Sequence, residues 1–332
     1  MYKRFFPTAP IWFFGALLFT ATLFPEEKLF AGAPQWDTAS AGQLALRQDG
    51  KDVWRFHYGD VTKPFFDPVC VAGGPSLTWA RPSDHAWHLG LWFSWKTING
   101  VNYWEENKGQ SDGKTRWTAP TLETHADGSA TLVLALEYLP GPRKTKGVEP
   151  SKVVPVLTEV RTIRFSAPAA DGSYFMDWTQ VFTAKADVKL DRSAPAFEKG
   201  GRPWGGYAGL SIRFAKDFSE VNSIASTKGR FSEKDNGHAL GDLAAEQNGL
   251  LGGKPYGLAI LAHPANPRAP GDWYFIKEEG KRNFYYLNAA VLLTAPLTYA
   301  KGETFTLRYR VCVHPGRWDA AQLRTAAGDF AK

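Results

Sequence analysis

The stretch "SYFMDWTQVFTA", residues 173–184, alternates its side chains in a way that predicts a strand of a large β-sheet. Successive side chains of an extended strand point to opposite faces. Phe175 and Asp177 therefore share one face, whereas Met176 and Trp178 share the other. The segment "ETFTLRYRVCVH", residues 303–314, alternates in the same way and predicts a second long strand.

Short runs of this kind recur along the chain, separated by Gly, Pro, Asn and Asp, and they include residues 130–139, 160–167, 207–215 and 256–264. Helical periodicity is confined to the tail, residues 317–332, which Trp318 or Asp319 opens. Many strands without intervening helices predict an all-β fold. We expect one large antiparallel β-sandwich with a short C-terminal helix. The absence of a fixed repeat period argues against a propeller.

The N-terminus has the three-part pattern of a secretory signal. Lys3 and Arg4 precede an uncharged apolar run of 14 residues, Ile11 to Phe24, and Ala31-Gly32-Ala33 supplies small residues for cleavage. The run is shorter than the ~20 residues that span a bilayer. We expect a signal peptide over residues 1–33, a single domain over residues 34–332, and a secreted or periplasmic protein. An uncleaved anchor is the alternative.

The composition of the chain limits the kinds of molecule that the protein can bind. The net charge of +6 is mild, and Lys and Arg are interspersed with Asp and Glu, so nucleic acid is excluded as the partner. No segment after the N-terminal run is long and apolar enough to span a membrane. Cys70 and Cys312 form either one disulfide, which an exported protein permits, or two buried thiols. The sequence leaves the oligomeric state open.

The densest group of chemically active residues lies in "GGPSLTWARPSDHAWHLGLWFSWKTINGVNYWEE", residues 73–106. Asp84, His85 and His88 follow Pro82 and are expected on a loop. Histidine transfers protons near neutral pH, and a neighbouring carboxylate fixes its tautomer. We therefore predict these three as catalytic residues, with Asp84 orienting one imidazole.

The Trp residues of this segment indicate the ligand. Asn99-Gly100 is a hairpin-turn signal that returns the chain toward Trp104. Trp faces stack on the apolar faces of sugar rings, so Trp92 or Trp104 is expected to provide a platform for a carbohydrate ligand.

A second group is expected to hold substrate hydroxyl or carboxylate groups: Arg213, His263, Asn266, Arg268 and His314. Several of these residues lie in loops, where binding sites concentrate. Polar residues on exposed strand faces are ordinary, and this is the structural alternative. The sequence requires no cofactor. Asp84, His85 and His88, with His263 or His314, leave a divalent metal open, although the helical zinc pattern is missing.

The chain resembles the DUF6807 group of bacterial proteins, also labelled "PmoA-like" or "methane oxygenase PmoA". The resemblance rests on Pro82, Asp84, His85, His88, Gly90, Leu91, Trp92, Ile98, Asn99, Gly100 and Trp104. It implies a supersandwich of the galactose-mutarotase type and an association with carbohydrate-degrading systems. Trp87 and Leu89 stand where the group usually has His and Arg, so the activity is altered or lost if those residues act in catalysis. A membrane oxygenase disagrees with a chain that lacks a spanning segment.

The leading hypothesis is an exported carbohydrate-active enzyme that uses His and carboxylate acid–base chemistry, of the epimerase, lyase or glycoside hydrolase type. A non-catalytic glycan-binding protein of the same fold is the alternative, and the departures at Trp87 and Leu89 favour it. A structural cell-surface domain is the third hypothesis.

Overall fold

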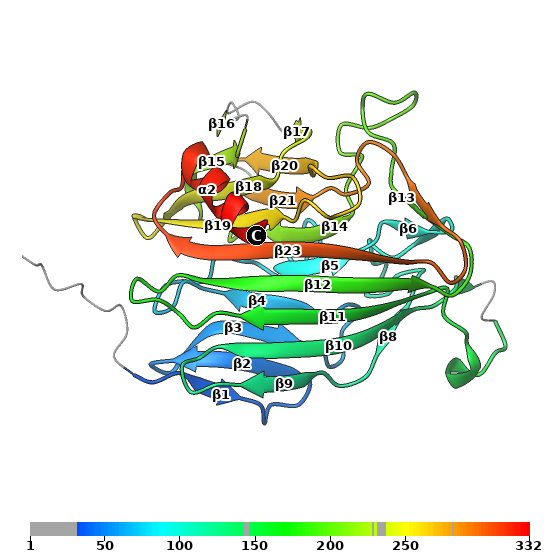
Figure 1. Cartoon of the computed structure of the whole chain (residues 1–332), viewed down its shortest axis with the longest axis horizontal. Coiled ribbons are helices and arrows are strands. Elements are labelled where there is room, and N and C mark those ends of the chain that lie inside the picture. The colour runs from blue at the N-terminus through cyan, green and yellow to red at the C-terminus, as the bar shows by residue number, and fades with distance from the viewer. Residues whose placement is uncertain (1–31, 143–145, 228, 231–236, 281) are drawn as a thin grey trace, which may run out of the picture.

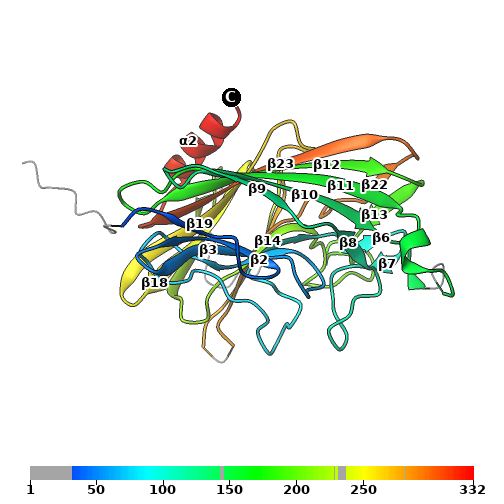
Figure 2. The same ribbon diagram turned by 90° about the horizontal axis from the view of Figure 1, so that it is seen from below.

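The computed structural model describes residues 32–142, 146–227, 229–230, 237–280 and 282–332. Two large antiparallel sheets face each other, as Figures 1 and 2 show, with a small third sheet at one end. This arrangement confirms the predicted antiparallel β-sandwich. Residues 1–31 lie outside the described residues, so the secretory signal stays a prediction. No helix among the described residues is long and apolar enough to cross a membrane.

The first sheet has nine strands, in the spatial order β1 (Gln35–Asp37), β2 (Gln43–Gln48), β3 (Lys51–His57), β4 (Phe65–Val69), β5 (Leu91–Ser94), β14 (Gly209–Arg213), β21 (Phe284–Ala289), β20 (Trp273–Glu278) and β17 (Gly237–Ala239). Its first five strands follow the chain, whereas its last four come from the second half. The middle of this sheet therefore joins segments that are far apart in the sequence.

The second sheet has ten strands, in the order β16 (Gly229–Arg230), β15 (Ser219–Ala225), β18 (Ala244–Leu251), β19 (Lys254–Ala262), β23 (Thr304–Pro315), β12 (Tyr174–Ala184), β11 (Leu157–Phe165), β10 (Ala130–Tyr138) and β8 (Thr115–Trp117), with β9 (Thr121–Thr124) also paired to β10. The predicted strands at 173–184 and 303–314 are β12 and β23, which pair directly. A 3₁₀ helix, η1 (Pro150–Lys152), lies in the β10–β11 connection.

The small sheet consists of β22 (Leu297–Tyr299), β13 (Val188–Asp191), β6 (Thr97–Ile98) and β7 (Val101–Asn102). β6 and β7 form the predicted hairpin, because Asn99 (φ 52°) and Gly100 (φ 78°) both take the left-handed conformation that this turn requires. The segment 185–206 contains β13, and a long loop follows that strand.

The main core fills the space between the two large sheets. Met176 and Trp178 of β12 are completely buried there, as the alternation of their strand predicts. The opposite face of the ten-stranded sheet is covered by α2 (Ala320–Phe330), seen above that sheet in Figure 2. Asp319 caps this helix by accepting hydrogen bonds from the backbone of Ala321 and Gln322. The predicted C-terminal helix is therefore confirmed.

The two cysteines are free and buried. Cys70 follows β4 of the nine-stranded sheet, whereas Cys312 lies on β23 and packs under α2 with Leu323. The two thiols belong to different sheets, and that of Cys312 faces away from the main core. Of the two alternatives left open by the sequence, the structure has two unbridged thiols.

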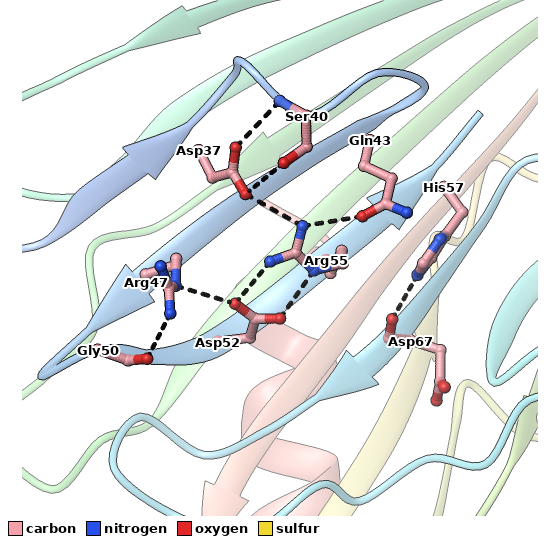
Figure 3. A network of polar contacts seen from close by, with 9 residues as sticks. All are labelled: Asp37, Ser40, Gln43, Arg47, Gly50, Asp52, Arg55, His57 and Asp67. Atoms are coloured by element: carbon pink, nitrogen blue, oxygen red, sulfur yellow. Dashed lines mark hydrogen bonds and ion pairs between the residues drawn. The ribbon is translucent and has the colours of Figure 1, made fainter. Parts of the chain in front are cut away.

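One half of the outer face of the nine-stranded sheet is polar. Figure 3 shows Arg55 of β3 between Asp52 and Asp37, at 2.8 and 3.2 Å, with Gln43 as a further acceptor at 2.9 Å. His57 contacts the backbone oxygen of Asp67 at 2.7 Å. The other half of this face, over β5, β14, β21 and β20, is aromatic, and the pocket described next lies there.

Candidate functional site

The floor of the site is the outer face of the nine-stranded sheet. Tyr274 and Ile276 of β20, and Phe284 and Tyr286 of β21, belong to a second apolar cluster on this face. The residues between them along each strand pack into the main core instead. Both faces of these strands therefore carry large apolar side chains, and loops from three parts of the chain cover the outer one.

A pocket of about 460 Å³ opens over this floor. It is lined by His85, Trp87, His88, Trp104, Glu105, Pro203, Trp204, Tyr207, Tyr274, Ile276, Glu278, Arg282, Phe284 and Tyr286. Its volume lies within the usual range of small-molecule sites, about 300–1,000 Å³. Aromatic rings, two imidazoles and two carboxylates make it the best candidate for a functional site among the described residues.

Two successive turns bring the imidazoles together. The backbone N–H of His85 donates to Pro82 O at 3.1 Å, and that of His88 donates to His85 O at 2.8 Å. The two ends of this loop are joined, because the backbone N–H of Arg81 donates to His88 O at 2.7 Å. The ring centroids of His85 and His88 are 4.8 Å apart. The predicted loop position of both histidines is confirmed.

A chain of three polar groups, a guanidinium, a carboxylate and an imidazole, leads from the sheet to the pocket. The Arg213 guanidinium, on β14, contacts both carboxylate oxygens of Asp84 at 3.2 and 3.3 Å. Asp84 Oδ2, one of these two oxygens, also lies 3.0 Å from His85 Nδ1. A carboxylate at Nδ1 favours the tautomer with its proton there, which leaves Nε2 as an acceptor. The arrangement equips His85 to take a proton from a ligand.

The ionisation of Asp84 and Arg213 supports this role. Burial acts to raise the pKa of Asp84, but the charge of Arg213 and the contact with His85 outweigh it, and the pKa lies below its ordinary value. Burial lowers the pKa of Arg213 to about 10, so its side chain stays cationic at neutral pH. Arg213 does not line the pocket; it is completely buried, 3.7 Å from the centroid of the Phe284 ring. It is placed to orient Asp84.

His88 differs from His85 in its surroundings. It is buried and packs on Tyr286, with ring centroids 5.1 Å apart. Burial, followed by the neighbouring charges, holds its pKa well below the ordinary value, so the ring is neutral. Its Nδ1 has no hydrogen-bond partner among the described residues. That nitrogen is itself buried, so His88 contributes a neutral ring to the pocket lining and no open hydrogen-bonding group at Nδ1.

Glu105 lies in the wall of the pocket and is held as an anion. Lys96 forms an ion pair with one of its oxygens, and the Tyr207 hydroxyl donates to the other. Burial acts to raise the pKa of Glu105, but Lys96 and these hydrogen bonds lower it below its usual value. Burial and the charge of Glu105 raise the pKa of Tyr207, so the phenol remains protonated.

The next residue, Glu106, has a different role. It lies outside the pocket and joins three loops, through Lys63 at 2.9 Å, Arg81 at 3.1 Å and the hydroxyl of Thr62. Lys63 and Glu106 are both buried, so the pair fixes the loop that carries Glu105 relative to the loop that carries His85. Buried, mutually hydrogen-bonded charges of this kind position neighbouring chain segments.

The tryptophans divide into two groups. Trp104 lines the pocket, 5.0 Å from the Tyr207 ring, and Trp87 and Trp204 line it as well. Trp92 is completely buried beneath Trp104 and belongs to the floor cluster, so it offers no ring face to a ligand. Trp104 is itself only 2% exposed, so neither Trp92 nor Trp104 presents an open ring face, and Trp87 and Trp204 are the more exposed tryptophans of the lining. Leu89, one of the two departures, is buried in the same cluster.

The second predicted group is not brought to the pocket. His263, Asn266 and Arg268 lie in the β19–β20 connection and line a separate, much smaller hollow. Asn266 fastens this loop to β23 through two hydrogen bonds with the backbone of Arg308, and Arg268 Nη2 donates to Pro296 O at 2.6 Å. Their polar groups are used within the fold, which corrects the expectation that they share a ligand with His85.

His314 is also remote from the pocket. It lies on β23 of the other sheet, stacked on Trp318 at 4.0 Å, with Nε2 3.6 Å from the buried carboxylate of Glu246. Only two of the four histidines considered from the sequence therefore converge. Within the described ranges, no group of three or more His, Cys, Asp or Glu side chains is arranged to hold a metal ion.

Sequence reasoning missed several lining residues, among them Trp204, Tyr274, Glu278, Arg282 and Tyr286. The available signal was the sequence of β20 and β21, "WYFIKE" and "FYYLNA", in which large side chains occupy both alternations. Such a strand is buried on two faces. A second covered face was thus predictable, but the loops that cover it were not.

A family model describing a family of unknown function, DUF6807, matches residues 43–328. The chain belongs to this family. The resemblance seen in the segment 82–104 is confirmed, and the DUF6807 match includes every residue of the pocket. A search of the curated proteins finds no match to the sequence.

Several solved structures resemble this DUF6807 protein distantly. The GH36 α-galactosidase AgaB from Geobacillus stearothermophilus is 9% identical, with a TM-score of 0.43 over 85% of this chain and 41% of that chain. An α-galactosidase from Lactobacillus brevis is 8% identical, with a TM-score of 0.44 over 84% and 39%. A heparan sulfate lyase HepC mutant from Pedobacter heparinus is 10% identical, with a TM-score of 0.31 over 83% and 30%. The chain thus spans well under half the length of each.

Proposed function

We propose that this protein is an exported carbohydrate-active enzyme in which His85 removes a proton from a sugar ring. The observation that carries the proposal is the Arg213–Asp84–His85 chain, which ends at an imidazole in the lining of an aromatic pocket. A histidine whose tautomer is fixed by a carboxylate is an effective general base. Trp87 and Trp204, the more exposed tryptophans of the pocket wall, suit the apolar face of a sugar.

The charges in the pocket favour an epimerase or lyase over a hydrolase. Hydrolysis by two carboxylates requires one of them to be protonated, so that it can act as the acid. Glu105 is held ionised by Lys96, and Glu278 forms an ion pair with Arg282 at 2.8 Å. Tyr207 is a weak acid here, because its pKa is raised and its hydroxyl already donates to Glu105. We infer a reaction in which His85 takes a ring proton, as an epimerase or a lyase requires.

Proton exchange with solvent tests this reaction directly. The protein is incubated in D₂O with a panel of mono- and oligosaccharides, and incorporation of deuterium at a ring carbon is followed by NMR. We expect His85→Gln to slow exchange by about 10²–10⁴-fold, the usual contribution of a general base. His125→Gln is the matched control, because His125 is exposed in the β9–β10 turn. Unchanged exchange in His85→Gln would overturn the assignment.

The alternative is a glycan-binding protein without catalysis. Trp87 and Leu89, the two departures from the family pattern, favour it, because they replace a possible acid–base residue and a cation. Binding of a glycan without deuterium exchange, and equal affinity in the wild type and His85→Gln, selects this alternative. We also propose that the sandwich is a supersandwich of galactose-mutarotase type, which the family resemblance supports.

A further inference from the structure

The loop that follows β13, residues 192–206, forms one rim of the pocket and presents an exposed aromatic side chain. Trp204 lines the pocket although 56% of its surface is accessible. We propose that Trp204 and Arg202 form an accessory subsite for an acidic sugar ring, so that the ligand is an acidic oligosaccharide. This inference rests on the proposed function in that both require a carbohydrate in the same pocket.

The rim loop is built to hold Trp204 in place. Arg202 N donates to Ala194 O and Gly205 N donates to Arg202 O, each at 2.9 Å, so the loop is hydrogen-bonded to itself on both sides of the tryptophan. The chain crosses itself closely here, because a Cβ on Gly205 would lie 2.1 Å from Ala194 O. The loop is also fastened to β17, where His238 Nε2 contacts Gly205 O at 3.1 Å.

The exposed indole is therefore a large apolar surface carried by an ordered stretch of backbone. Backbone that is already ordered loses little conformational entropy when the indole binds a ligand, which favours affinity. Trp offers a large flat face for the C–H groups of a sugar ring. Trp87, which is partly exposed, already offers such a face elsewhere in the pocket lining. A second face at the rim therefore indicates a second ring, and an oligosaccharide as the ligand.

Arg202 indicates the charge of that ring. Its guanidinium lies 5.9 Å from the centroid of the Trp204 ring, and its side chain is exposed. Throughout the described part of the chain, no ion pair joins Arg202 to a carboxylate. Two other cations near the pocket already have carboxylate partners: Arg282 pairs with Glu278, and Lys96 pairs with Glu105. Arg202 thus leaves its donors free for the carboxylate or sulfate of a sugar stacked on Trp204.

Matched pairs of acidic and neutral oligosaccharides test the subsite by calorimetric titration. Trigalacturonate is compared with its methyl ester, and κ-carrageenan tetrasaccharide with its desulfated form, so that the two arms distinguish a carboxylate from a sulfate. We expect one acidic member to bind about tenfold more tightly than its neutral partner, the value of one charge-assisted contact. Arg202→Gln should abolish that difference, and Trp204→Ala should weaken both members about tenfold.

Two variants serve as controls. Phe197→Ala removes the other exposed aromatic side chain of the rim loop, which is 58% accessible and does not line the pocket. Arg164→Gln removes an exposed arginine on β11 of the opposite sheet. Both should bind as the wild type does.

The inference is overturned if no acidic member binds more tightly than its neutral partner, or if Arg202→Gln keeps the preference. It is also overturned if Trp204→Ala binds as Phe197→Ala does. These readouts measure binding alone. Failure of the proposed catalysis, seen as unchanged exchange in His85→Gln, is therefore a separate result.

Discussion

Replacing Asp84 with Asn should destabilise the protein because it leaves the Arg213 charge buried without its partner. The Arg213 side chain is 0% exposed, and Asp84 contacts it at 3.2 and 3.3 Å. Breaking a buried ion pair costs about 3–5 kcal/mol. The Asp84 side chain is 21% exposed and Phe284 still contacts the guanidinium, so we expect the low end, about 3 kcal/mol.

A double-mutant cycle measured by urea denaturation separates this cost from other effects. The four proteins are the wild type, Asp84→Asn, Arg213→Met and the double variant. Methionine carries no charge that needs a partner, so the double variant should be more stable than the sum of the single losses by about 2 kcal/mol. Glu220→Gln is the control, because Glu220 pairs with Arg317 at the surface and should cost at most about 1 kcal/mol.

The pH dependence gives the same cycle a second readout. The pKa of Asp84 is lowered on folding from 3.8, so its stabilisation is complete above that value and is lost as the pH falls through the lower folded-state pKa. Asp84→Asn should therefore lose less stability than the wild type when the pH falls below 3.8. A loss as small as that of Glu220→Gln, or additive single losses, would refute the view that Arg213 depends on Asp84.

Three further predictions concern other parts of the molecule. Burial holds the pKa of His88 well below 6.5, so the free energy of unfolding should decrease as the pH falls below 6.5. His88→Gln should flatten that slope by up to about 1.4 kcal/mol per pH unit. An unchanged slope would contradict the burial argument. Burial raises the pKa of both Cys70 and Cys312 to about 12, so Ellman's reagent should modify neither thiol in the folded protein and both in guanidinium; an absent reaction in guanidinium would instead indicate a disulfide. Cleavage of the predicted signal should give an exported protein that begins at Pro34, and a mass that still includes residues 1–33 would contradict it.

The sheet structure was predictable because local alternation specifies it. β12 and β23 match the alternating segments, and the turn at Asn99-Gly100 and the cap at Asp319 follow from their own residues. Partnership between strands was not predictable. β5 pairs with β14, more than a hundred residues later in the chain, and the sequence contains no local signal for that pairing.

The residues of the candidate site also fall into a group that the sequence predicts and a group that it does not. Asp84, His85 and His88 were identified because they lie within one short loop, so their proximity follows from the chain itself. Arg213 comes from β14, and its contact with Asp84 depends on how the strands are ordered. His263 and His314 carried the same chemical signal as His85, yet the fold places them elsewhere. Residue type indicated which side chains could transfer protons, whereas the strand topology determined which of them lie in the same pocket.

The two covered faces of β20 and β21 have a practical consequence for protein engineering. Tyr274, Ile276, Phe284 and Tyr286 contribute to the pocket floor and all carry even numbers. Trp273, Phe275, Tyr285, Leu287 and Ala289 are odd-numbered and pack into the main core, whereas Lys277 does not. The four floor residues are themselves at most 8% exposed, so truncating any of them should lower thermal stability as well as change the pocket. In a deep mutational scan, truncations at both sets of positions should therefore reduce folding, and those at the four floor positions should in addition alter binding.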